Sequence, residues 1–173
     1  MCFQMKQMMK ILKTMVIMSS GNFAVVFKMQ DSRNGDYYAL KCFTREQEER
    51  SQSYKKIANE LSSIKSDYLI SLRYLEYELF VDTSNSDETE FPVLLMDWVE
   101  GVTLDIYIQQ FIGNSFELHD LCVEFAEMSK WLVVQSFAHG DLKPDNILVR
   151  PSGKIVLIDY DGMYTPSISR QTA

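Results

Sequence analysis

Four polar side chains in the C-terminal third of the sequence have the types and the spacing for phosphoryl-transfer chemistry. Asp141, Lys143 and Asn146 lie within one short run, His-Gly-Asp-Leu-Lys-Pro-Asp-Asn, and Asp159 follows thirteen residues later. Transfer of a phosphoryl group needs metal ligands, a cation on the phosphates and a carboxylate that orients the attacking hydroxyl. Carboxylate and amide oxygens also suit Mg²⁺. A loop followed by a hairpin would bring Asn146 and Asp159 to one place, as two ligands of the metal.

The segments around these residues predict the elements that position them. Short apolar runs at residues 147–149 and 155–158 read as two strands, joined by the turn Pro-Ser-Gly-Lys at residues 151–154. Apolar residues at helical spacing predict a long helix over residues 117–137, and a shorter helix is expected over 104–112. This half of the chain is therefore expected to be mainly helical, with one small hairpin.

The first half of the chain has a different pattern. Apolar runs predict strands, and Asn34-Gly35 is a strong hairpin signal between two of them. The expected strands cover residues 14–18, 24–29, 37–43, 69–81 and 91–98. A charged helix is expected over residues 47–65 and an acidic loop over 82–90. The order of elements predicts an α+β fold with two lobes and a boundary near residues 99–103.

The run from His139 to Asn146 resembles the catalytic loop of eukaryotic-type serine/threonine protein kinases, H-R-D-x-K-x-x-N, and Asp159 stands where the family has Asp-Phe-Gly. The resemblance implies Asp141 as the catalytic base and Lys143 on the γ-phosphate of ATP. It implies Asn146 and Asp159 as the Mg²⁺ ligands. It also implies a two-lobed fold, with residues 1–13 as an extension, 14–100 as the N-terminal lobe and 101–173 as a partial C-terminal lobe.

The N-terminal half carries a second part of the resemblance. Tyr38-Ala39-Leu40-Lys41 is similar to the V-A-I-K strand, whose lysine holds the α- and β-phosphates. Glu60 follows Lys41 by nineteen residues, and the resemblance implies an ion pair that positions the lysine. Glu48 and Glu49 lie in the same expected helix and remain alternatives.

The remaining nucleotide contacts are implied by two further segments. Residues 19–26 occupy the place of the glycine-rich loop, but only its middle glycine is present, as Gly21. The resemblance implies that Val26 and Ala39 cover the adenine. Residues 95–101 are similar to the hinge between the lobes, where backbone groups of Asp97 and Val99 would bond the adenine, with Met96 behind it.

Three departures from the family pattern bear on function. Gly140 replaces the arginine that commonly pairs with a phosphorylated activation loop. His-Gly-Asp also occurs in small-molecule kinases, whereas Lys143 favours the protein kinases. Asp161 follows Tyr160 where the family has glycine, and it could add a carboxylate near the metal or only shape the turn. The resemblance covers residues 14–166, so the C-terminal lobe is expected to be truncated and its long helix to be exposed.

The composition indicates which kinds of molecule the chain is expected to bind. The 173 residues carry a formal net charge of −7, which argues against a nucleic-acid binder. Cys2, Cys42 and Cys122 are widely spread and form no metal or disulfide pattern, which favours a reducing, cytoplasmic location. No apolar run is long enough to span a membrane. A protein substrate is expected, together with self-association through the exposed apolar face of the long helix.

The expected function is transfer of the γ-phosphate of ATP, with Mg²⁺, to a hydroxyl group of a protein. Two alternatives remain open. A pseudokinase that serves as an ATP-binding scaffold is suggested by the reduced glycine loop and the short C-terminal part. A small-molecule kinase is suggested by His-Gly-Asp.

Overall fold

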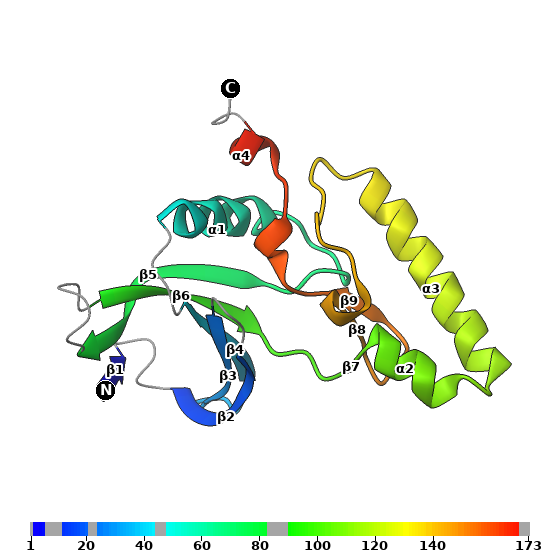
Figure 1. Cartoon of the computed structure of the whole chain (residues 1–173), viewed down its shortest axis with the longest axis horizontal. Coiled ribbons are helices and arrows are strands. Elements are labelled where there is room, and N and C mark those ends of the chain that lie inside the picture. The colour runs from blue at the N-terminus through cyan, green and yellow to red at the C-terminus, as the bar shows by residue number, and fades with distance from the viewer. Residues whose placement is uncertain (1, 6–11, 21–23, 44–47, 83–89, 170–173) are drawn as a thin grey trace. The chain divides into compact units, whose positions relative to one another are not determined.

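The structure is a computed structural model that describes residues 2–5, 12–20, 24–43, 48–82 and 90–169 (Figure 1). The chain divides into two compact units. The first comprises residues 1–58 and 71–98, and the second comprises residues 59–70 and 99–173. Antiparallel strands dominate the first unit and helices the second, so the predicted α+β class is confirmed.

The first unit is built on an antiparallel sheet. Among the described residues its six strands have the order β1-β5-β6-β4-β3-β2. Their bounds are β1 Cys2–Met5, β2 Leu12–Ser20, β3 Ala24–Asp31, β4 Tyr37–Phe43, β5 Leu72–Asp82 and β6 Glu90–Asp97. One face carries a buried apolar cluster made by Met29, Leu40, Leu79, Val93 and Leu95. These residues alternate along their strands with residues of the opposite face, as the period of two requires.

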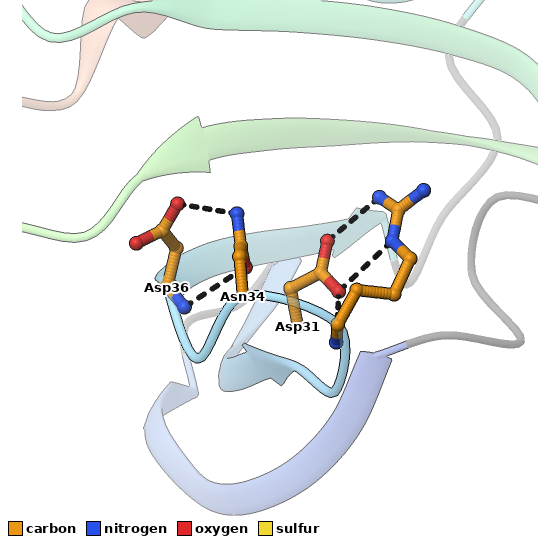
Figure 2. Close-up of polar contacts among 4 residues, drawn as sticks. Asp31, Asn34 and Asp36 are labelled. Carbon is orange, nitrogen blue, oxygen red and sulfur yellow. Dashed lines mark hydrogen bonds and ion pairs between the residues drawn. The ribbon is translucent and has the colours of Figure 1, made fainter.

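The turn between β3 and β4 shows how local polar bonds fix this hairpin (Figure 2). The main chains of Asp31 and Asp36 close the loop, because the Asp31 N–H donates to the Asp36 carbonyl at 2.8 Å. Asn34 Oδ1 accepts from the Asp36 N–H at 3.1 Å, and Gly35 adopts a positive φ of 83°. The guanidinium of Arg33 bonds the buried Asp31 carboxylate and lowers its pKa. The hairpin predicted from Asn34-Gly35 is present, with a four-residue loop between the closing residues.

Helix α1, Glu48–Leu61, lies within the helix predicted over residues 47–65. Tyr54, Ile57, Ala58 and Leu61 are its buried residues, at the i, i+3, i+4, i+7 spacing of one face. The helix ends four residues earlier than predicted. The hydroxyl groups of the next two serines, Ser62 and Ser63, donate back to the carbonyl groups of Asn59 and Glu60, and such bonds compete with helix continuation.

The second unit combines a small antiparallel sheet with helices. Its strands pair in the order β7-β8-β9. The bounds of its elements are β7 Val102–Thr103, α2 Leu104–Phe111, α3 Ser115–Val133, β8 Ile147–Val149, β9 Ile155–Leu157 and α4 Pro166–Ser169. Residues 59–70 group with this unit, although the sequence assigned them to the N-terminal lobe. The reason is long-range bonding: the Leu157 N–H donates to the Tyr68 carbonyl, and the Ile70 N–H donates to the Tyr160 hydroxyl, each at 2.9 Å.

Helix α3 differs at both ends from the predicted range of 117–137. It begins earlier because Asn114 caps it, with Oδ1 accepting from the N–H groups of Phe116 and Glu117 at 3.1 and 3.4 Å. It ends at Val133 in a tight turn, where the Gln135 N–H donates to the Leu132 carbonyl at 3.1 Å. No helix in the described part of the chain has the length and apolarity needed to cross a membrane.

Candidate functional site

Two sequence-predicted catalytic residues and one predicted metal ligand lie together in the loop before β8. Pro144–Asn146 forms a single 3-10 turn, closed by the Asn146 N–H donating to the Lys143 carbonyl at 2.9 Å. The Asn146 side chain is 4% exposed, and its Nδ2 donates to both the carbonyl and Oδ2 of Asp141, each at 2.9 Å. Lys143 Nζ donates to the same Oδ2 at 2.8 Å. Asp141, Lys143 and Asn146 therefore form one bonded cluster.

The charge of this cluster is set by the pair of Asp141 and Lys143. The hydrogen bond from Lys143 lowers the pKa of the Asp141 carboxyl, and the bond from Asn146 Nδ2 lowers it further. The same contact raises the pKa of Lys143. Asp141 is thus ionised at neutral pH. A half-exposed carboxylate in this state can accept a hydrogen bond from a hydroxyl group and orient it.

Asp159 is brought beside this cluster by the backbone of its neighbour Ile158. The Ile158 N–H donates to the Asn146 carbonyl at 2.9 Å, and the Ile158 carbonyl accepts from His139 Nε2 at 3.0 Å. His139 is 2% exposed, and burial lowers its pKa. Asp159 itself has φ 60° and ψ 80°, the only positive φ outside glycine among the described residues. Such a conformation costs about 1–2 kcal/mol and recurs at functional sites.

The donor atoms of Asn146 and Asp159 fit a hard divalent cation. The Nδ2 group of Asn146 donates to Asp141, so the amide Oδ1 is the atom of this side chain that could bind a metal. Asp159 adds a carboxylate from the end of β9. One amide oxygen and one carboxylate would suit Mg²⁺, which prefers oxygen ligands.

Gly140 is required by a close approach that the sequence did not reveal. Its φ is 77°, and a Cβ at this position would lie 1.8 Å from the carbonyl oxygen of Gly162. No side chain, arginine included, fits there while that backbone stays in place. Asp161 is exposed on the 3-10 turn Tyr160–Gly162 that forms the other side of this contact. The two segments that differ from the family pattern, at Gly140 and at Tyr160–Gly162, are therefore in contact with each other.

Tyr160 is a structural residue of the site that sequence analysis missed. Its side chain is 2% exposed, its hydroxyl donates to the Leu157 carbonyl at 2.9 Å, and burial raises its pKa. Its ring stands edge-on to His139, with 5.7 Å between centroids. The signal available in the sequence was the aromatic residue after Asp159, which the altered Asp-Tyr-Asp pattern obscured.

In the first unit, strand register gathers four predicted residues on one face of the sheet. Val26 of β3 pairs with Lys41 of β4, and Ala39 of β4 pairs with Met96 of β6. Because Ala39 and Lys41 are two residues apart, all four side chains share the face opposite the buried apolar cluster. Lys41 Nζ donates to the hydroxyl of Tyr54 on α1 at 2.9 Å.

The other predicted nucleotide-binding residues do not belong to this group of four. The Asp97 N–H donates to the Ser71 carbonyl at 3.1 Å, and burial raises the pKa of the Asp97 carboxyl. Val99 is half-buried. Gly21 lies outside the described residues. Glu60 Oε1 accepts from the Ser167 N–H at 3.1 Å. The ion pair between Lys41 and Glu60 would join residues of the two units, and it stays a prediction.

Comparisons with known proteins agree on one family. Residues 12–166 match the protein kinase domain. The cAMP-dependent protein kinase catalytic subunit of Dictyostelium discoideum is 26% identical over 164 residues, which cover 90% of this chain and 23% of that protein. A probable serine/threonine-protein kinase of the same organism is 27% identical over 149 residues, 84% of this chain and 22% of its own length.

A more local match comes from the serine/threonine-protein kinase PknA of a Nostoc species, which is 35% identical over 74 residues, 42% of this chain and 13% of that protein. The chain spans less than a quarter of the length of each of these relatives. Because the family match extends over most of the sequence, from β2 to the start of α4, the chain belongs to the protein kinase domain family.

Proposed function

We propose that this chain transfers the γ-phosphate of ATP, in the presence of Mg²⁺, to a serine or threonine hydroxyl of a protein substrate. The observation that carries the proposal is the bonded cluster of Asp141, Lys143 and Asn146, with Asp159 tied beside it through Ile158. Family membership and the serine/threonine kinases among the relatives support the same reaction.

Each residue of the cluster has a distinct role in the proposed reaction. Asp141 accepts a hydrogen bond from the substrate hydroxyl and aims its oxygen at the γ-phosphorus. As the new O–P bond forms, the bond from the γ-phosphorus to the β–γ bridging oxygen breaks, ADP leaves, and the hydroxyl proton passes to Asp141. Because the lowered pKa of Asp141 makes it a weak base, orientation is its main contribution and proton transfer comes late.

The cations of the proposed site offset the charge of the phosphates. Lys143 lies 2.8 Å from Asp141 Oδ2, so it can hold a γ-phosphate oxygen close to the hydroxyl that Asp141 orients. Lys41 is assigned to the α- and β-phosphates. Mg²⁺ bound by Asn146 and Asp159 would neutralise charge on the β- and γ-phosphates.

The adenine end of the proposed ATP site rests on residues of the sheet. Val26, Ala39 and Met96 share the face of Lys41 and provide small or unbranched apolar surface for a flat ring. The backbone of Asp97 and Val99 is proposed to bond the ring edge, and Gly21 to approach the phosphates.

The second candidate is a pseudokinase that binds ATP without turning it over. The carboxylate of Glu60, the predicted partner of Lys41, accepts a hydrogen bond from the Ser167 N–H. If that bond persisted with nucleotide present, the phosphates would bind without the usual carboxylate partner of the lysine. Phe116 and Val133 at the two ends of α3 are exposed, but nothing in the described part of the chain shows what covers them, and self-association is not proposed.

The proposed function is tested by two measurements on the same protein. Mg·ATP at about a hundred times its Kd should raise the free energy of unfolding by roughly 2.7 kcal/mol, and Lys41→Ala with Asp159→Ala should abolish this shift. Phosphate transfer to a peptide library that offers serine and threonine hydroxyls should fall by about 10²–10⁴-fold in Asp141→Asn.

Asp145→Asn is the matched control, because Asp145 is exposed on the same turn and bonds none of the cluster residues in the described part of the chain. Binding of Mg·ATP without any transfer would favour the pseudokinase. Equal transfer by Asp141→Asn and the unaltered protein would reject the assigned roles.

A further inference from the structure

The side chain of Lys41 is held by a phenol. Its Nζ donates to the hydroxyl of Tyr54 at 2.9 Å, and the same ammonium lies 5.4 Å from the centroid of the Tyr54 ring. Lys41 belongs to β4 and Tyr54 to α1, thirteen residues later, and both lie in the first unit. The contact therefore fixes where the sheet lysine points relative to the adjacent helix.

Tyr54 is itself fixed in place, so it can direct a flexible partner. Its side chain is 3% exposed, and its ring packs on Phe43 with 5.4 Å between centroids. The next residue of the helix, Lys55, pairs with Glu76 of β5. Helix α1 thus contacts β4 and β5 at this turn, and burial of the Tyr54 ring against Phe43 restricts where its hydroxyl can lie.

Glu60, the partner that the family pattern implies for Lys41, lies elsewhere on α1. Six residues separate Glu60 from Tyr54, which corresponds to about 9 Å along the helix axis and about 120° around it. Glu60 is in the last turn of the helix and accepts from the Ser167 N–H at 3.1 Å. Within the first unit, Tyr54 is a side chain of α1 that bonds the lysine of β4.

We propose that Tyr54 is a positioning residue for Lys41, which holds the ammonium ready for the phosphates of the nucleotide. The inference rests on the proposed function, in which Lys41 binds those phosphates. A phenol oxygen accepts one proton of the ammonium. Because the phenol is neutral, it directs the lysine without adding a negative charge beside the phosphates.

The test is Tyr54→Phe, which removes the hydroxyl and keeps the buried ring. Its matched control is Tyr77→Phe, the same change at a residue of β5 that is 62% exposed. We expect the Kd for Mg·ATP, measured by titration calorimetry, to rise about tenfold in Tyr54→Phe and to stay unchanged in Tyr77→Phe. Unchanged or tighter binding by Tyr54→Phe would overturn the inference, as would a larger loss in Glu60→Gln than in Tyr54→Phe.

A double-mutant cycle separates positioning of Lys41 from a general structural role. In a Lys41→Ala background, Tyr54→Phe should weaken Mg·ATP binding no further, because the hydroxyl has lost the group through which it acts. An equal loss in both backgrounds would mean that the hydroxyl supports the fold and not the lysine.

Failure of the proposed function is recognised by a readout that needs no nucleotide. Without nucleotide, the rate at which an amine-reactive acylating reagent labels Lys41, read by mass spectrometry, should rise in Tyr54→Phe and not in Tyr77→Phe, because the lysine nitrogen is no longer held against the phenol oxygen. Equal labelling in Tyr54→Phe and the unaltered protein would overturn the inference. If the unaltered protein bound no Mg·ATP while the labelling difference was present, the proposed function and the positioning role would both fall, and the lysine–phenol contact alone would stand.

Discussion

The two units hold their proposed phosphate-binding lysines in different ways. In the second unit, Lys143 bonds the carboxylate of Asp141. The main-chain carbonyl of Asp141 accepts from the side chain of the buried Asn146. The main-chain carbonyl of Asn146 in turn accepts from the Ile158 N–H. In the first unit, the sheet carries Lys41 and the phenol of Tyr54 directs it. We therefore expect the site of the second unit to be sensitive to changes of the main chain, and the site of the first unit to a change of the Tyr54 side chain.

The largest expected effect tests the main-chain dependence of the second unit. Gly140→Ala places a Cβ 1.8 Å from the Gly162 carbonyl oxygen, whereas Gly153→Ala, at nearly the same φ, meets nothing within 4 Å. Both variants incur the strain of a positive φ, about 1 kcal/mol. We expect Gly140→Ala to lose about 3 kcal/mol or more of unfolding free energy in urea titration, because the two backbones must separate. Equal losses in the two variants would show that the close approach is not a constraint.

An effect of intermediate size on the unfolding free energy is expected when one ion pair from each unit is removed. Lys154 bonds Glu124 at 2.6 Å, and the Glu124 side chain is only 7% exposed, whereas both members of the pair Lys55–Glu76 in the first unit are largely exposed. Among the described residues, Lys154→Ala leaves the buried carboxylate with only the Ile155 N–H at 3.4 Å, so we expect a loss of about 2 kcal/mol. Lys55→Ala should change the unfolding free energy by less than about 0.5 kcal/mol. Chemical denaturation measures both, and the reverse order would contradict the burial of Glu124.

The smallest expected effect is a pH dependence from His139. In the neutral imidazole, Nε2–H is the donor to the Ile158 carbonyl and Nδ1 carries no proton; Nδ1 has no partner among the described residues. Burial lowers the pKa in the fold below the usual value near 6.5. The unfolded chain therefore binds a proton that the folded chain does not, and the unfolding free energy should fall as the pH drops below about 6.5.

His139→Gln should remove this part of the pH dependence, and His119→Gln, at an exposed histidine of α3, should retain it. Unfolding free energies at pH 7.5 and pH 5.5 provide the check. An unchanged pH dependence in His139→Gln would mean that the buried imidazole is protonated in the fold as readily as in the unfolded chain.

Short-range patterns carried most of what could be predicted. The strands predicted over residues 14–98 and the Asn34-Gly35 hairpin depend on residues close in sequence, and strands are present there. Strands β1 and β7 were not predicted. The α+β class and the kinase family followed from the same patterns. Local signals were sufficient because strand period, turn chemistry and motif spacing act over fewer than about twenty residues.

Long-range contacts account for what the sequence did not reveal. In the sequence, Gly140 indicated only that the family's arginine is absent. The close approach of Gly140 to the Gly162 carbonyl explains why glycine stands there. Tyr54 could not be identified as the partner of Lys41, because the choice between side chains of α1 depends on how the helix packs on the sheet. Residues 59–70 were assigned to the first lobe because nothing local indicates their bonds to residues about ninety or more positions later.

The second unit is made of two separate stretches of sequence, residues 59–70 and 99–173. This arrangement has a consequence for how the chain folds as it is synthesised. The strands of the first unit are all present once residue 98 has emerged, but Tyr68 and Ile70 find their partners only when Leu157 and Tyr160 follow. Glu60 must wait for Ser167, 107 residues later. Closing such long loops is slow, and residues 59–70 are exposed in the meantime. During this interval, the segment between the third turn of α1 and the start of β5 is where we expect a chaperone or a protease to act on the nascent chain.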